Sequence, residues 1–290
     1  MDAIVERLTG PLLEPATAVL FRKALCLYVA VNIGIMLPVA EQLFGPDSYT
    51  LPLRDAGLLA MRGWNLLATP FIREYYWLFI VVLYVALALA FWGKWVRASM
   101  FVAWVLSVNL TLGALGITNG GYHLINLLLF AAFLIGKPQP NAPSTKWQVI
   151  DRLAAQLGFL GARVQVALLY TVAGLYKLFG ADWQAGEAMY YILNVEAFRL
   201  PWMADMVDEN GLLLQLATWL AMSYQLAFPV LVWFRKLRWP VLLAGTLMHL
   251  FIAFGMGLMD FGFAMLVAYV VFYPNSYAEK LLLRLGVQHS

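Results

Sequence analysis

The sequence has little charge for its length. Charged residues make up 12% of its 290 residues, and hydrophobic residues make up 63% with a mean hydropathy of +0.76. Soluble domains usually carry about 25% charged residues. The composition therefore excludes an ordinary soluble domain and indicates a polytopic membrane protein.

Cysteine and histidine are also scarce. Cys26 is the only cysteine, which excludes an intramolecular disulfide and a cysteine-based metal site. His123, His249 and His289 show no metal-binding spacing, so we expect no metal. Phosphate-loop, G-x-S-x-G and haem-attachment motifs are lacking. The lack of an internal repeat disfavours a transporter, and the net charge of +3 needs no nucleic-acid partner.

The first residues do not resemble a cleaved signal peptide. Asp2, Glu6, Arg7 and Glu14 interrupt them, and they lack an apolar core and a cleavage site. We expect residues 1–17 to be a retained cytoplasmic segment, residues 18–275 to form the membrane domain, and residues 276–290 to be a cytoplasmic tail.

Long apolar stretches predict an all-α fold of about eight membrane-spanning helices. The hydrocarbon core of a bilayer needs about 20 apolar residues per helix. Pro38 and Pro229 lie inside such stretches and should kink them. A tight turn at 118–121 predicts a helical hairpin from the third and fourth stretches. The eight stretches are 24–44, 75–92, 98–117, 121–136, 153–178, 212–234, 239–257 and 260–274.

Charge then predicts the orientation. With both termini cytoplasmic, most lysines and arginines fall on the inner side, as the positive-inside rule requires. The outer side keeps only Arg54, Arg62, Arg73, Lys177 and Arg199. We expect a bacterial inner (cell) membrane protein. Two long outer segments, 45–74 and 179–211, mix apolar and acidic residues, which predicts short interfacial helices that either anchor the chain or cap a cavity.

Lys177 is the residue that most invites a functional explanation. It lies at the outer end of an apolar stretch, and an ionisable group at membrane depth is costly. One interpretation is a lysine that extends its ammonium to the headgroups. The other is an amine in an apolar cavity, where the neutral form is favoured and can act as a base.

The other candidates have two interpretations as well. Asp182 is expected to cap an interfacial helix, or else to pair with Lys177. His123 and His249 can relay protons, bind a quinone oxygen or bond a neighbouring helix. Asn32 and Asn109 are expected to make interhelical hydrogen bonds. Aromatic residues near the outer ends fit an interfacial belt or the walls of a quinone site.

The segment Ala173-Gly174-Leu-Tyr-Lys177-Leu-Phe-Gly-Ala-Asp182-Trp183-x-x-Gly186 resembles the core of the HTTM domain, the membrane region of vitamin K-dependent gamma-carboxylases. The resemblance runs from about residue 18 to 275. It continues through Gln225 to Trp233, the basic residues 235–238, His249 to Ala253, and Phe272-Tyr273-Pro274.

The resemblance implies a chemistry. Lys177 matches the lysine regarded as the base that deprotonates reduced vitamin K, and His123 is similar to a histidine near the reacting site. We expect a reduced, vitamin K-like quinone as cofactor and no metal. Tyr176, Asp182, Trp183 and His249 are expected to line the substrate site.

The sequence ends at residue 290, soon after the last apolar stretch. We therefore expect no luminal substrate-binding domain, as in short bacterial SdpB-like members. Two functions stay open: a carboxylase-like enzyme with an outward cavity for a lipid quinone, or a non-catalytic scaffold or maturation partner for an exported peptide or toxin. Expected partners are membrane lipids and, in the second case, a secreted or membrane protein.

Overall fold

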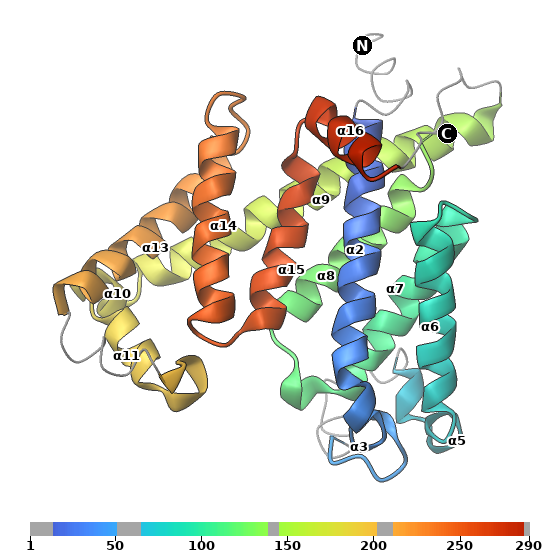
Figure 1. Cartoon of the computed structure of the whole chain (residues 1–290), viewed down its shortest axis with the longest axis horizontal. Coiled ribbons are helices and arrows are strands. Elements are labelled where there is room, and N and C mark those ends of the chain that lie inside the picture. Colours follow the sequence, from blue (N-terminus) through green and yellow to red (C-terminus); the bar gives the residue numbers. More distant parts are fainter. Residues whose placement is uncertain (1–13, 51–64, 139–144, 202–210, 287–290) are drawn as a thin grey trace. The chain divides into compact units, whose positions relative to one another are not determined.

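The computed structural model describes residues 14–50, 65–138, 145–201 and 211–286, and all regular elements in these ranges are helices (Figure 1). The all-α prediction is therefore confirmed for the described residues. The chain divides into two compact units. Unit 1 comprises residues 1–162 and 273–290, and unit 2 comprises residues 163–272.

Unit 1 is a set of packed apolar helices. The helix α2 packs against α6, and α7 packs against both α6 and α8. Its helices are α2 (Pro15–Met36), η1 (Leu37–Val39), α3 (Ala40–Phe44), η3 (Leu66–Ala68), α5 (Pro70–Arg73), α6 (Tyr76–Phe91), α7 (Val96–Gly113), η4 (Leu115–Ile117), α8 (Gly120–Ile135), the first half of α9 (Lys146–Leu178) and α16 (Asn275–Arg284).

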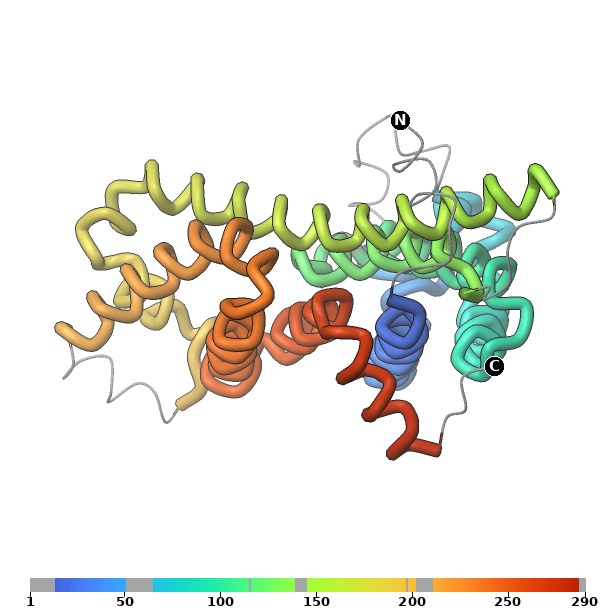
Figure 2. The backbone as a smooth tube through the Cα atoms, turned by 90° about the horizontal axis from the view of Figure 1, so that it is seen from above, coloured from blue at the N-terminus to red at the C-terminus, as the bar shows by residue number. Residues whose placement is uncertain are grey.

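Unit 2 begins within α9, which is one continuous helix (Figure 2). Inside this unit, α13 contacts α10, α11 and α14, and α14 packs on α15. The remaining elements of unit 2 are α10 (Ala181–Ala185), α11 (Ala188–Asn194), η5 (Glu196–Phe198), α13 (Gly211–Leu231), α14 (Arg238–Phe254), α15 (Met259–Tyr269) and η7 (Val270–Phe272).

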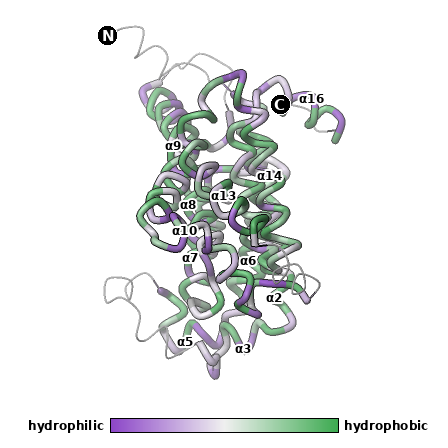
Figure 3. The backbone as a smooth tube through the Cα atoms, turned by 90° about the vertical axis from the view of Figure 1, so that its left-hand side faces the viewer, coloured by the Kyte–Doolittle hydropathy of each residue, from purple (hydrophilic) through white to green (hydrophobic). Residues whose placement is uncertain are grey.

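Several helices are compatible with an integral membrane protein, and Figure 3 shows their hydrophobic colouring. Within the described residues, 4 are long and apolar enough to cross a membrane, and a fifth is added if α15 and α16 form one broken span. The 4 are 15–44, 96–113, 146–178 and 211–231. Three shorter apolar helices are α6, α8 and α14. Each of the eight predicted stretches thus contains a helix.

The local predictions at Pro38 and at the hairpin are confirmed. The helix α2 ends at Met36, and Pro38 lies in the short 3₁₀ turn η1 before α3 begins. Pro229 lies inside α13, near its end. The turn between α7 and α8 ends at Asn119, whose side chain accepts a hydrogen bond from the Gly121 amide at 2.8 Å and caps α8.

The predicted C-terminal tail contains most of α16, and the first residue of this helix, Asn275, bonds the first turn of α2. Asn275 Oδ1 accepts hydrogen bonds from the amides of Ala16 (2.8 Å) and Thr17 (3.3 Å). The N-cap residue of α2 makes no side-chain capping bond, so Asn275 satisfies amides that would otherwise lack a partner. Ala278 and Leu282 of α16 are fully buried.

The outer segments form short helices where they are described. The apolar residues at 51–64 and 202–210 lie outside the described residues. In α11, Met189 and Leu193 are buried against Leu214 of α13. The Met189 amide also donates to Thr218 Oγ1 at 3.0 Å. Packing and a buried hydrogen bond thus hold α11 against α13.

Candidate functional site

Three tyrosines and one histidine meet inside unit 2. They come from four helices: Tyr170 from α9, Tyr224 from α13, His249 from α14 and Tyr269 from α15. Tyr170 and Tyr269 are each 1% exposed and His249 is 2% exposed. We call these four residues the Tyr–His cluster.

Hydrogen bonds join the cluster into one chain of polar atoms. The Tyr170 hydroxyl lies 2.6 Å from His249 Nε2 and also contacts the Tyr269 hydroxyl. The Tyr269 hydroxyl lies 3.0 Å from that of Tyr224. The Tyr224 hydroxyl reaches the Val241 carbonyl oxygen at 3.1 Å.

The end of this chain assigns the direction of its hydrogen bonds. The Val241 carbonyl can only accept, and each hydroxyl has one hydrogen to donate. If Tyr224 donates to Val241, then Tyr269 donates to Tyr224, Tyr170 donates to Tyr269, and His249 Nε2–H donates to Tyr170. The reverse order loses the bond to Val241. The network therefore assigns the Nε2–H tautomer to a neutral His249.

This tautomer leaves one nitrogen of His249 unused. Nδ1 is buried and has no hydrogen-bond partner among the described residues. In this tautomer Nδ1 carries a lone pair, so it accepts a hydrogen bond or a proton. A buried acceptor without a partner costs free energy, on the order of 1–3 kcal/mol. A ligand hydroxyl that donated to Nδ1 would remove that cost.

Aromatic rings pack around the cluster. The ring of Phe228 lies 4.2 Å from that of Tyr170 and 5.6 Å from that of Tyr269, centroid to centroid. Phe261 packs edge-on to His249 at 5.7 Å. Gly245 provides the space for the hydroxyls, because a Cβ there would lie closer than 3.0 Å to the oxygens of Tyr224 and Tyr269.

Lys177 lies two helical turns from Tyr170 on the same face of α9, because seven residues make almost two turns. Its Nζ lies 4.7 Å from the centroid of the Trp183 ring. An ammonium is attracted to the face of an indole. The structure therefore brings together two of the predicted site residues, Lys177 and Trp183.

The prediction that Asp182 caps a helix is wrong. The N-cap of α10 is Gly180, which has no side-chain capping bond, and Asp182 lies in the first turn of that helix. A carboxylate in the first turn still interacts favourably with the helix dipole. Within the described residues no ion pair joins Asp182 to Lys177. Asp182 and Tyr176 are both exposed.

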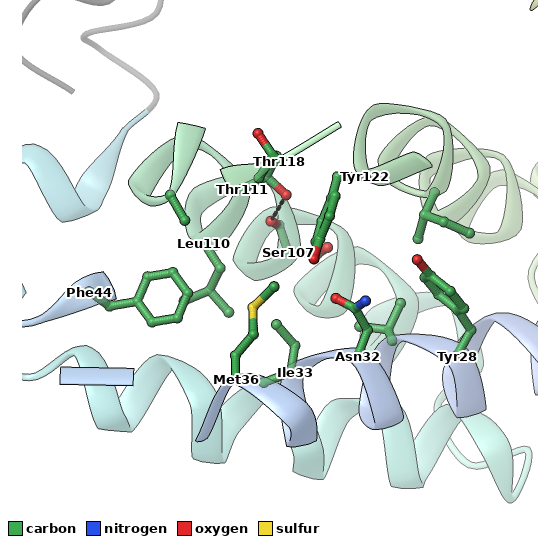
Figure 4. Close-up of a pocket in the computed structure, with 13 residues that line it drawn as sticks. Tyr28, Asn32, Ile33, Met36, Phe44, Ser107, Leu110, Thr111, Thr118 and Tyr122 are labelled. Carbon is green, nitrogen blue, oxygen red and sulfur yellow. Dashed lines mark hydrogen bonds between the residues drawn. The ribbon is translucent and has the colours of Figure 1, made fainter. Parts of the chain in front are cut away.

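His123 is in unit 1, in the first turn of α8, and its side chain is exposed. Beside it in sequence, Tyr122 lines a small pocket between α2, α7 and α8. Figure 4 shows Tyr28, Asn32 and Met36 of α2 facing Thr118 and Tyr122 across this pocket. Its volume is about 20 Å³, enough for roughly one water molecule and too small for a quinone ring.

Asn109, which was expected to make an interhelical hydrogen bond, bonds the short 3₁₀ element η3. Its Oδ1 accepts from the Leu66 amide at 2.7 Å, and its Nδ2 donates to the Val105 carbonyl of its own helix at 2.9 Å. The side chain thus holds the short η3 turn against α7. Asn32 lines the pocket of unit 1.

The tyrosines of the cluster were not predicted as site residues. Tyr170, Tyr224 and Tyr269 lie within apolar helices or at the end of one, whereas the aromatic residues singled out from the sequence lie near the predicted outer ends. Tyrosines deep in apolar helices are a usable signal, because a buried hydroxyl needs a partner. As for metals, the described residues include no group of three or more histidine, cysteine, aspartate or glutamate side chains that could hold an ion.

Comparison with known proteins finds no relative of the chain. No protein-family model matches the chain, and no curated protein or solved structure matches it. The likeness to the HTTM domain thus stays a prediction from the residues around Lys177.

Proposed function

We propose that the chain is an integral membrane protein in which all eight apolar helices cross a bacterial inner membrane, with both termini cytoplasmic. The support is the presence of a helix in each of the eight apolar stretches. The bias of lysine and arginine toward one set of connections gives the orientation. Cysteine accessibility labelling checks it: a single cysteine at the exposed position Lys236 should react only after the inner side is opened.

In this proposal, unit 2 is a carboxylase-like centre that deprotonates a reduced lipid quinone. The observation that carries it is the buried, unpartnered Nδ1 of His249 at the end of a chain of tyrosine hydroxyls. A hydroquinone has a hydroxyl at each end of its ring. His249 Nδ1 accepts from one of them, and Lys177, as a neutral amine, is the base for the other.

The proton movement follows from the hydrogen-bond directions. A proton that passes from a quinol oxygen to Nδ1 makes an imidazolium and a phenolate. The Nε2–H of that imidazolium remains bonded to Tyr170. The three hydroxyls all donate away from His249, so their dipoles stabilise positive charge on the ring and favour the transfer.

Lipid mass spectrometry of the purified protein tests this function. Wild type should carry a bound quinone at about one per chain, and both Lys177→Ala and His249→Gln should lose it. Lys236→Ala, a lysine on an exposed turn of the same unit, is the matched control and should keep it. Ordinary phospholipid alone in wild type and in all variants would contradict the proposal.

A second function is favoured by the surroundings of Lys177. The contact with Trp183 favours the charged ammonium, and the neighbouring Tyr176 and Phe179 are 80% and 79% exposed. A scaffold or maturation partner for an exported peptide would use such a surface for recognition. It predicts full function in Lys177→Arg, which keeps the charge but cannot act as a base, and a secreted or membrane protein that purifies with the chain.

A further inference from the structure

A buried arginine in the first half of α2 has no anion beside it among the described residues. Arg22 is 5% exposed, and its Nε and Nη1 are buried and have no hydrogen-bond partner in the part of the chain that the structure describes. Among the described residues no carboxylate pairs with it. A buried charge is strongly unfavourable unless it is paired and hydrogen-bonded. A bound anion that accepted hydrogen bonds from Arg22 would therefore stabilise it.

The adjacent lysine is satisfied in another way. Lys23 is 9% exposed, and its Nζ donates to the Phe91 carbonyl at 2.7 Å. The same Nζ lies 4.1 Å from the centroid of the Phe91 ring. These contacts fix α2 to the end of α6 and place a second positive charge beside Arg22 without adding a negative one.

The turn between α6 and α7 lies beside Arg22. Gly93 has φ +77°, and a Cβ built there would lie 3.8 Å from Arg22 Nη2. Trp92 and Trp95, on either side, are 74% and 78% exposed. Trp95 has φ +44°, the left-handed region that a bulky residue rarely adopts. Exposed indoles of this kind are typical of the headgroup level of a bilayer.

We propose that Arg22 and the turn at 92–95 bind a phosphate group at the membrane surface. Nε and a terminal nitrogen of a guanidinium form an edge that matches two phosphate oxygens. Lys23 adds attraction for an anion, and the two indoles lie where headgroups lie. The phosphate belongs either to an anionic phospholipid or to a small soluble phosphate compound. Both sources supply negatively charged oxygens that can accept hydrogen bonds from Arg22.

Binding to the purified full-length chain in detergent tests the site. The ligands are phosphatidylglycerol, phosphatidylcholine and inorganic phosphate, and the readouts are the dissociation constant and the melting temperature. Wild type should bind phosphatidylglycerol, and Arg22→Gln should bind it roughly 10- to 100-fold more weakly, the factor expected for a hydrogen bond to a charged group. Arg235→Gln, which removes an exposed arginine of unit 2, is the matched control and should bind like wild type.

Which of these ligands bind identifies the source of the phosphate group. Binding of phosphatidylglycerol but not of inorganic phosphate supports a lipid. Binding of both, lost together in Arg22→Gln, supports a small phosphate compound. Failure of wild type to bind either one, or equal binding by wild type and Arg22→Gln, overturns the proposal.

The melting temperature without added anion gives an independent readout. Arg22→Gln removes an unpaired buried charge, so it should melt at the same temperature as wild type or higher. A lower melting temperature would show that the chain itself supplies the anion and would overturn the proposal. The double variant Asp2→Asn/Glu6→Gln neutralises acids that precede α2 and lie outside the described residues; it should leave phosphate binding unchanged.

Discussion

The two units bury different kinds of polar side chain. In unit 1 the buried polar groups are hydroxyls, amides and basic groups spread over several helices. Apart from tyrosines, Thr218 and His249 are the only buried polar side chains among the described residues of unit 2. The scarcity of buried polar groups in unit 2 makes it more informative that one cluster holds three of them, Tyr170, His249 and Tyr269, together with the half-buried Tyr224.

The hydrogen-bond networks of the two units also differ, because one is closed and the other is open. In unit 1, Ser107 donates to Asn126 (2.6 Å), Asn126 donates to Thr111 (2.9 Å), and Thr111 donates to the Ser107 carbonyl (2.9 Å). That loop of bonds closes on itself and joins α7 to α8. The Tyr–His cluster is open at His249 Nδ1. A closed network serves packing, and an open one has capacity left for a ligand.

The largest expected effect comes from filling the space at Gly245. In Gly245→Ala the new Cβ would meet the hydroxyls of Tyr224 and Tyr269, on separate helices. We expect a loss of stability of about 3 kcal/mol or more, because neither ring can move without disturbing the cluster. Thermal melting of the detergent-solubilised protein measures the loss.

Gly161→Ala is the matched control for this substitution. Gly161 lies on α9, and a Cβ there has no other atom within 4 Å. Alanine should leave stability unchanged or raise it by up to about 1 kcal/mol, since it favours the helix. Equal losses in both variants would show that the cluster is not tightly packed.

The next effect concerns the hydroxyl at the centre of the cluster. Tyr170→Phe removes the partner of both His249 and Tyr269, so we expect a loss of about 2–3 kcal/mol and loss of quinone binding. Tyr84→Phe in unit 1 removes one bond, to the Ala30 carbonyl at 2.8 Å, and should cost about 1 kcal/mol without affecting quinone. A smaller cost for Tyr170→Phe would remove the contrast between the units.

Thr218→Val tests the contact between α11 and α13. Thr218 Oγ1 accepts from the Met189 amide and donates to the Leu214 carbonyl. Valine keeps the shape but leaves the buried amide unpaired, at a cost of about 1–2 kcal/mol. Hydrogen exchange of the Met189 amide should quicken while exchange in α14 stays as in wild type; unchanged exchange at Met189 would contradict this arrangement.

The smallest effect is expected at the ion pair of unit 1. Arg97 and Asp151 pair while 34% and 31% exposed, and Arg97 also donates to the Leu134 carbonyl. Solvent screens a half-exposed pair, so Asp151→Asn should cost less than about 1 kcal/mol. The cost should shrink further in high salt, and melting at two ionic strengths checks this. A large, salt-independent cost would show that unit 1 depends on this pair.

Local features were predictable because local rules govern them. Apolar stretches became helices, Pro38 interrupted one of them, and the turn before α8 was closed by Asn119. Each outcome depends on residues a few positions apart. The predicted cap of α10 was wrong because the helix starts two residues earlier than expected, which places Asp182 inside the helix and makes Gly180 its N-cap.

The candidate site was predictable only in part. Lys177 and His249 were found because ionisable groups are rare in apolar helices, and the contact of Lys177 with Trp183 joins residues six apart in sequence. The partners of His249 were not found. Tyr170 is 79 residues away, and no periodicity relates them.

The sequence by itself determined that this is an apolar, all-helical chain whose helices suit a membrane, because charge and hydropathy are properties of each segment. Only the tertiary structure decided which polar groups are satisfied. The carbonyl of Val241 orients three tyrosines and leaves His249 Nδ1 open, and the end of α6 satisfies Lys23 but not Arg22. Hydrogen bonds are short and directional, so they depend on positions that only the packed helices define.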